Sequence, residues 1–308
     1  MPLDAFTLRG LTAELAERCV DTKIDKVTQP TRDEIILNLR GRNGGGRLLL
    51  SAGSGSPRAC LTAEARENPA VPPMFCMLLR KLIGGGIIRR VTQPSAERML
   101  AFEIEAMDEL GELRTLRLVL ELITRRANLV LVDQEGRIID CIRRVEGDLA
   151  EGKRQVLPGL FYRPPEAREG IDPFAASPEE IEAAVASFVP GADLTEEILK
   201  TFRGFAPLVC RELAFRYPDG GAALSGAICA LREGEQLAPW LILKDGVPKD
   251  FSALEPTQYG EGWSWERMES YSQLMERFFS TRDREERVRA AARDMTRTIS
   301  NAKDRATR

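Results

Sequence analysis

Several charged and amide side chains in the first half of the chain could bind a negatively charged partner. They lie between residues 80 and 128: Arg80, Lys81, Glu97, Arg98, Arg125, Arg126 and Asn128. A guanidinium can hold a phosphate or a base edge through two hydrogen bonds, and an adjacent carboxylate can orient it. Arginine and asparagine both suit base edges, and arginine also stacks on bases. The alternative is that these residues have no ligand. Glu97 and Arg98 would then form a surface ion pair, which contributes under about 1 kcal/mol to stability, and Arg125 and Arg126 would form a basic hairpin tip.

Histidine is absent from the 308 residues, which removes imidazole bases, His-dependent triads and most zinc sites in common use. The six cysteines are scattered without a CxxC pair, and this pattern favours buried, reduced thiols. We therefore expect no metal, no cofactor and no catalytic constellation; enzymatic chemistry is not excluded, but its usual groups are missing.

Arg80 and Lys81 end a short apolar segment with clear boundaries. Residues 68–86 read NPAVPPMFCMLLRKLIGGG. The two prolines favour an extended entry, and residues 74–83 then predict a mostly apolar helix. Three glycines end this helix, and the two cations suit its negative C-terminal end. The basic corner could bind an anion, or it could be an ordinary helix C-cap.

The expected fold class is α+β, with three pieces. Residues 1–165 predict a β-rich mixed domain in which two helices pack on a half-solvated antiparallel sheet. We expect a helix over 2–18 and strands over 23–28, 34–39, 47–51, 87–92, 98–106, 113–123, 128–133 and 138–142.

Residues 171–265 predict a helical domain with a small strand pair. Ser177 caps one helix, and the run LTEEILKTFRGFAPLVCRELAFR predicts a helix, a turn at Gly204 and a second helix. This layout resembles a helix-hairpin-helix module, which commonly binds a phosphate backbone, although an ordinary helical hairpin has the same pattern.

Residues 266–308 predict the start of a coiled-coil arm. Tyr271, Met275 and Phe278 have the spacing of a coiled-coil seam, and a second block continues at Val288, Ala292, Met295 and Ile299. A lone helix has nothing to bury this seam against, so we expect the chain to be the N-terminal part of a longer protein.

Composition is that of a globular protein, with 43% apolar and 30% charged residues. The apolar runs are too short for a membrane helix and no signal peptide opens the chain, so we expect a cytoplasmic protein without a membrane partner. The pI near 5.5 argues against general coating of nucleic acid. Residues 1–165 carry 25 basic and 22 acidic residues, so a local basic surface is expected there.

Motifs along nearly the whole chain resemble the NFACT family, also called fibronectin-binding protein A-like. They are MPLDAFTLRGLTAEL, KIDKVTQPTRDEIILNLR, LLLSAGSGSPRACLT, PPMFCMLLRK, DELGE, ELITRRANLVLVD and YSQLMERFFSTRDREERVR. The resemblance implies that the first domain is similar to the N-terminal fold of formamidopyrimidine-DNA glycosylase.

The same resemblance implies tRNA contacts. Glu97 and Arg98 stand where the family usually has an Asp-Arg pair implicated in tRNA engagement. In ELITRRAN, Glu121, Arg125 and Asn128 match a family motif that otherwise reads E-x-M-G-R-x-S-N. Arg126 stands where histidine is frequent, and the family's glycine is replaced by threonine.

The implied role is ribosome quality control. Such a protein binds large ribosomal subunits obstructed by peptidyl-tRNA and recruits a tRNA, typically tRNA-Ala. The ribosome then adds an alanine tail to the stalled chain without a template. Since the ribosome would make the peptide bonds, the chain is predicted not to be an enzyme. Two alternatives stay open. One is a fibronectin-binding adhesin, and the other is a glycosylase-like enzyme with Pro2 as nucleophile, although Leu3 replaces the acid that such enzymes need.

Overall fold

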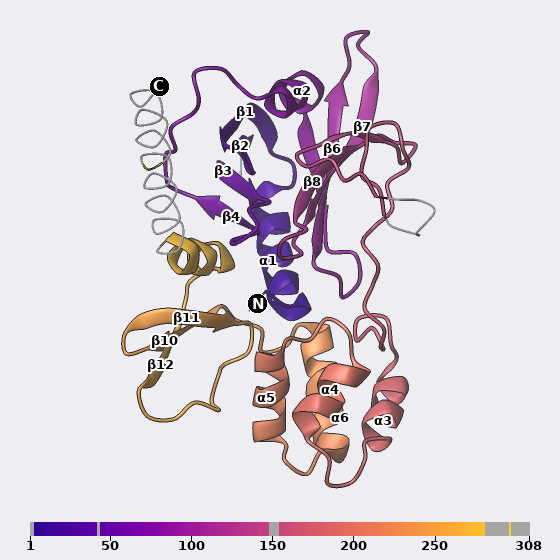
Figure 1. The fold of residues 1–308 in the computed structure, drawn as a ribbon, viewed down its shortest axis with the longest axis vertical. Coiled ribbons are helices and arrows are strands. Elements are labelled where there is room, and N and C mark those ends of the chain that lie inside the picture. Colours follow the sequence, from indigo (N-terminus) through magenta and orange to yellow (C-terminus); the bar gives the residue numbers. More distant parts are fainter. Residues whose placement is uncertain (1–2, 42–43, 148–153, 281–295, 297–308) are drawn as a thin grey trace, which may run out of the picture.

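A computed structural model describes residues 3–41, 44–147, 154–280 and 296. Within this part of the chain, the first unit has two helices and nine strands: α1 (Ala5–Cys19), α2 (Met74–Ile83), β1 (Lys23–Thr31), β2 (Glu34–Gly41), β3 (Gly44–Ser51), β4 (Arg58–Thr62), β5 (Ile87–Thr92), β6 (Met99–Met107), β7 (Leu113–Glu121), β8 (Asn128–Val132) and β9 (Ile138–Cys141). A helical unit follows on one side of it, with a small sheet beside that unit (Figure 1).

The nine strands form one antiparallel sheet in the order β4-β3-β2-β1-β5-β6-β7-β8-β9. Helix α1 contacts both β4 and β5, which are four positions apart in this order. Strands lie about 4.8 Å apart, so a flat sheet would separate these two by roughly 19 Å, wider than a helix. The sheet therefore curves around α1, as Figure 1 shows. Helix α2 packs on β1 and β6.

The helical unit contains α3 (Pro178–Ala186), α4 (Leu194–Thr201), α5 (Pro207–Arg216) and α6 (Gly221–Glu233). The predicted capping box of α3 is present, because Ser177 and Glu180 each accept from the other's backbone N–H. Helices α4 and α5 pack together across the predicted glycine turn. The predicted strand pair forms β10 (Trp240–Lys244) and β11 (Val247–Ser252), and β12 (Trp263–Arg267) adds a third strand beside β10.

The predicted coiled-coil seam is buried inside the chain where the structure describes it. Residues 271–280 are helical, and the side chains of Tyr271, Met275 and Phe278 are at most 7% exposed. Glu14 of α1 accepts hydrogen bonds from the N–H groups that begin this helix, at 2.6 Å for Tyr271. The expectation that this block lacks a partner is therefore wrong. The second block, apart from residue 296, lies outside the described residues.

One continuous buried apolar cluster links α1, the large sheet, the helical unit, the small sheet and residues 271–279. The two units therefore share a core rather than meeting across a polar interface. All six cysteines are free, and all except Cys229 are buried. Burial raises the pKa of the Cys60 and Cys210 thiols to about 12, and the buried, free cysteines agree with the expectation of buried, reduced thiols. No helix in the described part of the chain is long and apolar enough to cross a membrane.

Candidate nucleic-acid interface

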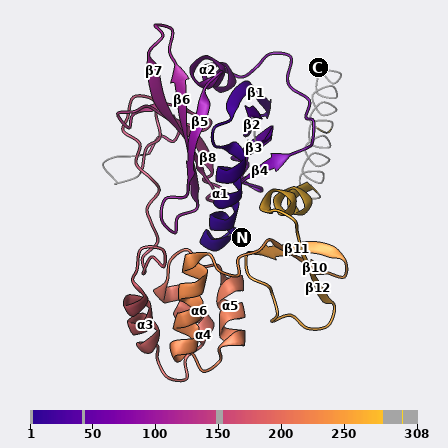
Figure 2. The same ribbon diagram turned by 180° about the vertical axis from the view of Figure 1, so that it is seen from behind.

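A cavity of about 360 Å³ lies where the sheet unit meets the helical unit. It is enclosed by the start of α1, the β5–β6 loop, the β7–β8 loop and the turn between α4 and α5. The N-terminal end of α1 points at the helical unit in both Figure 1 and Figure 2. The cavity's volume is in the range of sites for small ligands or one nucleotide, roughly 300–1,000 Å³.

Seven charged residues line this cavity. Four are arginines and three are acids: Arg98, Arg126, Arg168, Arg203, Asp4, Glu97 and Glu166. Three of them, Glu97, Arg98 and Arg126, are residues that the sequence had indicated. The structure thus brings the Glu97–Arg98 pair and the β7–β8 loop to one place.

The β5–β6 loop is fixed by hydrogen bonds to neighbouring elements. The amide of Gln93 donates to the backbone oxygens of Ala5 and Glu97, both at 3.1 Å. Ser95 has a φ of 56°, a left-handed conformation that non-glycine residues adopt rarely and only in constrained turns. Glu97 and Arg98 are therefore held at a defined position against the first turn of α1.

Arg98 lies within electrostatic reach of two carboxylates, Glu97 and Asp4, while partial burial lowers its pKa. Arginine keeps its charge in proteins, so the side chain is a partly desolvated cation. Among the described residues no hydrogen-bond or ion-pair partner of this guanidinium is found. The neighbouring Glu97 pairs with Arg203 instead, at 3.8 Å. The fork of Arg98 is thus available to a ligand in the cavity.

Asp4 is a site residue whose role the sequence did not reveal. Its Oδ1 caps α1 by accepting from Thr7 N at 2.7 Å, and the side chain is only 3% exposed. Within the described part of the chain its buried Oδ2 has no hydrogen-bond partner, and burial raises the pKa of the carboxyl to about 6. An unpaired buried oxygen suits a ligand that donates a hydrogen bond, such as an amino or imino group of a base. The available sequence signal was an acid in the first turn of the helix predicted over 2–18.

Arg203 connects the two units and was also missed. Its guanidinium bonds to Asp172 at 2.7 Å and to the hydroxyl of Ser95 at 3.3 Å. The next residue, Gly204, has a φ of 84° and its carbonyl accepts from Ala5 N at 2.9 Å. The hairpin turn therefore packs against α1, with part of it lining the cavity. Its use as a phosphate-binding module stays a prediction.

The predicted residues in and beside the β7–β8 loop differ in where they lie. Arg125 and Arg126 are exposed, and only Arg126 lines the cavity. Arg125 has a φ of 66°, a left-handed conformation one residue after Thr124, which stands in place of the family's glycine. Glu121 at the end of β7 is 1% exposed and bonds to the hydroxyl of Tyr162 at 2.8 Å, which makes it structural.

Asn128 is not a surface residue, which corrects its assignment as a base-reading amide. It is 2% exposed, and its amide donates to Arg143 O at 2.8 Å. Its oxygen accepts from the N–H groups of Leu129 and Arg143. These bonds hold the start of β8 against the chain that follows β9, and they leave the side chain no access to a partner.

Arg80 and Lys81 lie away from the cavity, near the other end of β6. The Arg80 guanidinium donates to Val27 O at 2.8 Å and so anchors α2 on β1. Lys81 pairs at 2.9 Å with Glu109 in the hairpin after β6, whereas Arg98 directly precedes β6. A strand rises about 3.3 Å per residue, so the two places are roughly 30 Å apart. The predicted residues therefore do not form one site.

The cavity is rich in arginine, and no metal-ligating cluster of His, Cys, Asp or Glu occurs among the described residues. Two helix N-termini border it, and that of α5 has no side-chain cap. Helix N-termini favour anionic groups. Arginine forks, an unpaired carboxyl oxygen and helix N-termini together suit a phosphate next to a hydrogen-bonding base. Pro2, considered above as a nucleophile, lies outside the described residues.

A family model for the NFACT N-terminal and middle domains matches residues 4–308. The chain belongs to the NFACT family. The Rqc2 homologue RqcH of Bacillus subtilis (strain 168) is 34% identical over 307 residues, covering 98% of this chain and 53% of that protein. RqcH of Streptococcus suis (strain 05ZYH33) is 38% identical over 183 residues, covering 59% of this chain and 33% of that protein.

Among solved structures, the N-terminal part of the fibronectin/fibrinogen-binding protein from Streptococcus suis is similar, with a TM-score of 0.80. The two are 28% identical, and the match covers 91% of this chain and 99% of that one. This likeness confirms the predicted mixed fold with a large antiparallel sheet. The chain spans about half the length of the RqcH protein of Bacillus subtilis.

Proposed function

We propose that this chain holds a tRNA, tRNA-Ala in the first instance, for a ribosome quality control factor. In this role the whole protein binds large ribosomal subunits obstructed by peptidyl-tRNA and promotes template-free alanine tailing of the stalled chain. The ribosome itself makes each peptide bond, so the chain needs no nucleophile, metal or cofactor. Membership of the NFACT family and the similarity to RqcH proteins support this assignment.

The observation that carries the proposal is the guanidinium of Arg98, which lies within electrostatic reach of Asp4 and Glu97 and has no hydrogen-bond or ion-pair partner among the described residues. A phosphate or a base edge of tRNA satisfies the Arg98 fork, and the same ligand can donate to the free oxygen of Asp4. Arg126 and Arg168 on the rim attract the phosphate backbone through charge, while selectivity comes from the groups inside. This division explains how a chain with a pI near 5.5 can bind RNA at one place.

The test is retention of total deacylated tRNA by the chain, followed by sequencing of what is retained. Wild type is compared with Arg98→Ala and with Arg40→Ala, which removes an equally charged side chain from β2. Arg40 is 70% exposed and pairs with Asp25, and it does not line the cavity. We expect enrichment of tRNA-Ala by wild type and by Arg40→Ala. Retention by Arg98→Ala should fall by about tenfold or more, the loss of one charge-assisted contact.

Equal losses in both variants would mean that charge alone attracts RNA, which contradicts a specific site. Repeating the comparison with the longer protein on obstructed large subunits extends the test to alanine tailing. The alternative function is adhesion, because the similar Streptococcus suis structure is of a fibronectin/fibrinogen-binding protein. Retention on immobilised fibronectin that is unaffected by Arg98→Ala, with no retention of tRNA, would favour adhesion.

A further inference from the structure

The hairpin that joins β6 to β7 extends beyond the rest of the sheet, as Figure 1 shows. Its tip is the DELGE motif, residues 108–112, which the proposed tRNA site does not use. Three large apolar side chains are exposed on and beside the tip: Met107 by 64%, Leu110 by 83% and Leu113 by 63%. Polar residues normally occupy such a tip, so a grouped set of exposed apolar side chains indicates a contact surface.

The tip is a rigid turn rather than a loose loop. Oδ1 of Asp108 accepts from the N–H groups of Leu110 and Glu112, both at 2.9 Å. The backbone N–H of Asp108 donates to Glu112 O at 2.9 Å, and Gly111 has the φ of 82° that this closure needs. Arg114 adds an ion pair to Oδ2 of Asp108 at 2.5 Å. The leucines are therefore presented in a fixed geometry, which lowers the entropy lost on binding.

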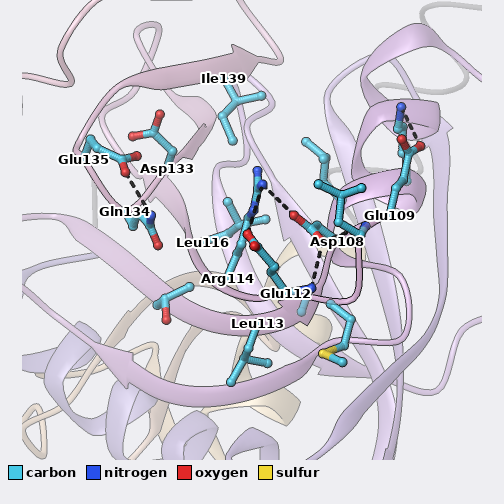
Figure 3. Close-up of a pocket in the computed structure, with 16 residues that line it drawn as sticks. Asp108, Glu109, Glu112, Leu113, Arg114, Leu116, Asp133, Gln134, Glu135 and Ile139 are labelled. Carbon is cyan, nitrogen blue, oxygen red and sulfur yellow. Dashed lines mark hydrogen bonds and ion pairs between the residues drawn. The ribbon is translucent and has the colours of Figure 1, made fainter.

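A groove of about 690 Å³ runs from this tip past the end of α2 to the β8–β9 turn (Figure 3). Besides the exposed Leu113, its floor includes Leu116 and Ile139. Its lining contains five acidic residues: Asp108, Glu109, Glu112, Asp133 and Glu135.

The two basic residues of the lining are already neutralised by its own acids. Lys81 pairs with Glu109 at 2.9 Å, and Arg114 lies between Asp108 and Glu112. On the opposite wall Asp133 and Glu135 have no cationic partner among the described residues. The groove therefore carries a net negative charge next to exposed apolar side chains.

We propose that this groove is a docking site for a cationic polypeptide segment with apolar side chains. The lysines or arginines of such a segment would face the acidic wall while its apolar residues cover Leu110 and Leu113. An RNA backbone does not fit here, because the net negative charge of the groove repels phosphate. The proposal goes beyond tRNA binding and does not depend on it, since the groove and the arginine-rich cavity lie at opposite ends of β6.

The probe is a fluorescein-labelled peptide of alternating lysine and leucine, and binding to the intact chain is followed by fluorescence anisotropy. Two comparison peptides replace the lysines by glutamate or the leucines by serine. The apolar variant is Leu110→Ser with Leu113→Ser, and the charge variant is Glu112→Lys with Glu135→Lys. Val189→Ser with Phe215→Ser is the apolar control, because both side chains are well exposed at 62% and 59% outside the groove.

We expect the lysine–leucine peptide to bind, and each groove variant to weaken it by about tenfold. The control variant should bind as wild type does, and both comparison peptides should bind weakly. Absence of binding at the highest soluble peptide concentration overturns the proposal. So does equal binding by the groove variants, or strong binding of the glutamate–leucine peptide. Retention of tRNA should be unchanged in the charge variant, which keeps this test separate from that of the proposed function.

Discussion

The buried carboxyl of Asp4 makes stability depend on pH in a direction opposite to that of most acids. Its pKa is about 6 in the folded chain and 3.8 in a solvated reference, with burial as the largest cause. The folded state therefore binds this proton more tightly than the unfolded state does. The side chain is only 3% exposed, so solvent screening does not reduce this difference much. The stabilisation is complete below the unfolded pKa and is lost as the pH rises through about 6.

The difference in pKa corresponds to about 3 kcal/mol, at 1.36 kcal/mol for each unit. Asp4→Asn keeps an oxygen that can cap α1 through Thr7 N, and it carries no charge at any pH. We therefore expect the free energy of unfolding of the variant to gain on that of wild type by roughly 2–2.5 kcal/mol between about pH 4 and pH 7.5, since at pH 4 part of the ~3 kcal/mol is already lost.

The assay is urea unfolding of both proteins across this pH range, with the difference between them as the readout. Taking the difference cancels the titration of other groups that the substitution leaves unchanged. Asp193→Asn is the control, since Asp193 caps α4 through Thr195 N at 2.8 Å but is exposed. The difference in free energy of unfolding between Asp193→Asn and wild type reports the effect of the same change of capping group in solvent.

A difference between wild type and Asp4→Asn that does not change with pH would refute the reasoning. A difference that shrinks as the pH rises would mean that attraction to Arg98 outweighs the burial of the carboxylate. We also expect Asp4→Asn to retain less tRNA at neutral pH although it is more stable. A stability cost at a residue that serves binding is a common compromise at functional sites.

Two further predictions separate structural from functional positions. A Cβ built on Gly10 would lie 2.2 Å from the Tyr271 ring, so Gly10→Ala should lower the free energy of unfolding by roughly 1–2 kcal/mol. A Cβ at Gly226 in α6 meets open space, so Gly226→Ala should raise the free energy of unfolding by about 0.5–1 kcal/mol. Thermal unfolding of the two glycine variants checks that their effects have opposite signs. Asn128→Ala leaves the backbone groups of Arg143 unpaired and should cost roughly 2–3 kcal/mol. Retention of tRNA by Asn128→Ala, measured well below the melting temperature of the variant, should equal that of wild type. A loss of tRNA retention under these conditions would mean that Asn128 does belong to the binding site.

The sequence was sufficient for elements whose own pattern decides their structure. Strands β5 to β9 alternate or run apolar over their length, and each was expected close to its observed bounds. Strand β4 was missed because its first residue, Arg58, reads as a polar loop position. In the structure Arg58 is 2% exposed, lies over the Phe279 ring and is near Glu34 at 3.8 Å. These partners are distant in sequence, so no local pattern could reveal that the strand is buried.

The misses in the site have the same cause. Glu97, Arg98 and Arg126, which line the cavity, could be named as candidates because their residue types and their places in family motifs mark them. Asp4 and Arg203 become site residues only because the start of α1 meets the helical unit, a contact that no local pattern encodes. Asn128 is the opposite case, because it was predicted to contact a base and is buried instead. The sequence alone does not distinguish an asparagine that joins two backbone segments from one that is free to contact a base.

The contacts at this junction determine what kind of binding site the cavity can be. A Cβ at Gly204 would approach both Ala5 and Ala96 to 2.8 Å, so the turn, α1 and the β5–β6 loop are in direct backbone contact. The bond from Ala5 N to Gly204 O and the Arg203–Asp172 pair fix their relative position. A sliding motion between the units would break these contacts and open the shared core. The backbone segments that carry the arginines of the two units are therefore held in place before a ligand arrives, which fits the proposed binding of a rigid tRNA surface better than closure around a small substrate.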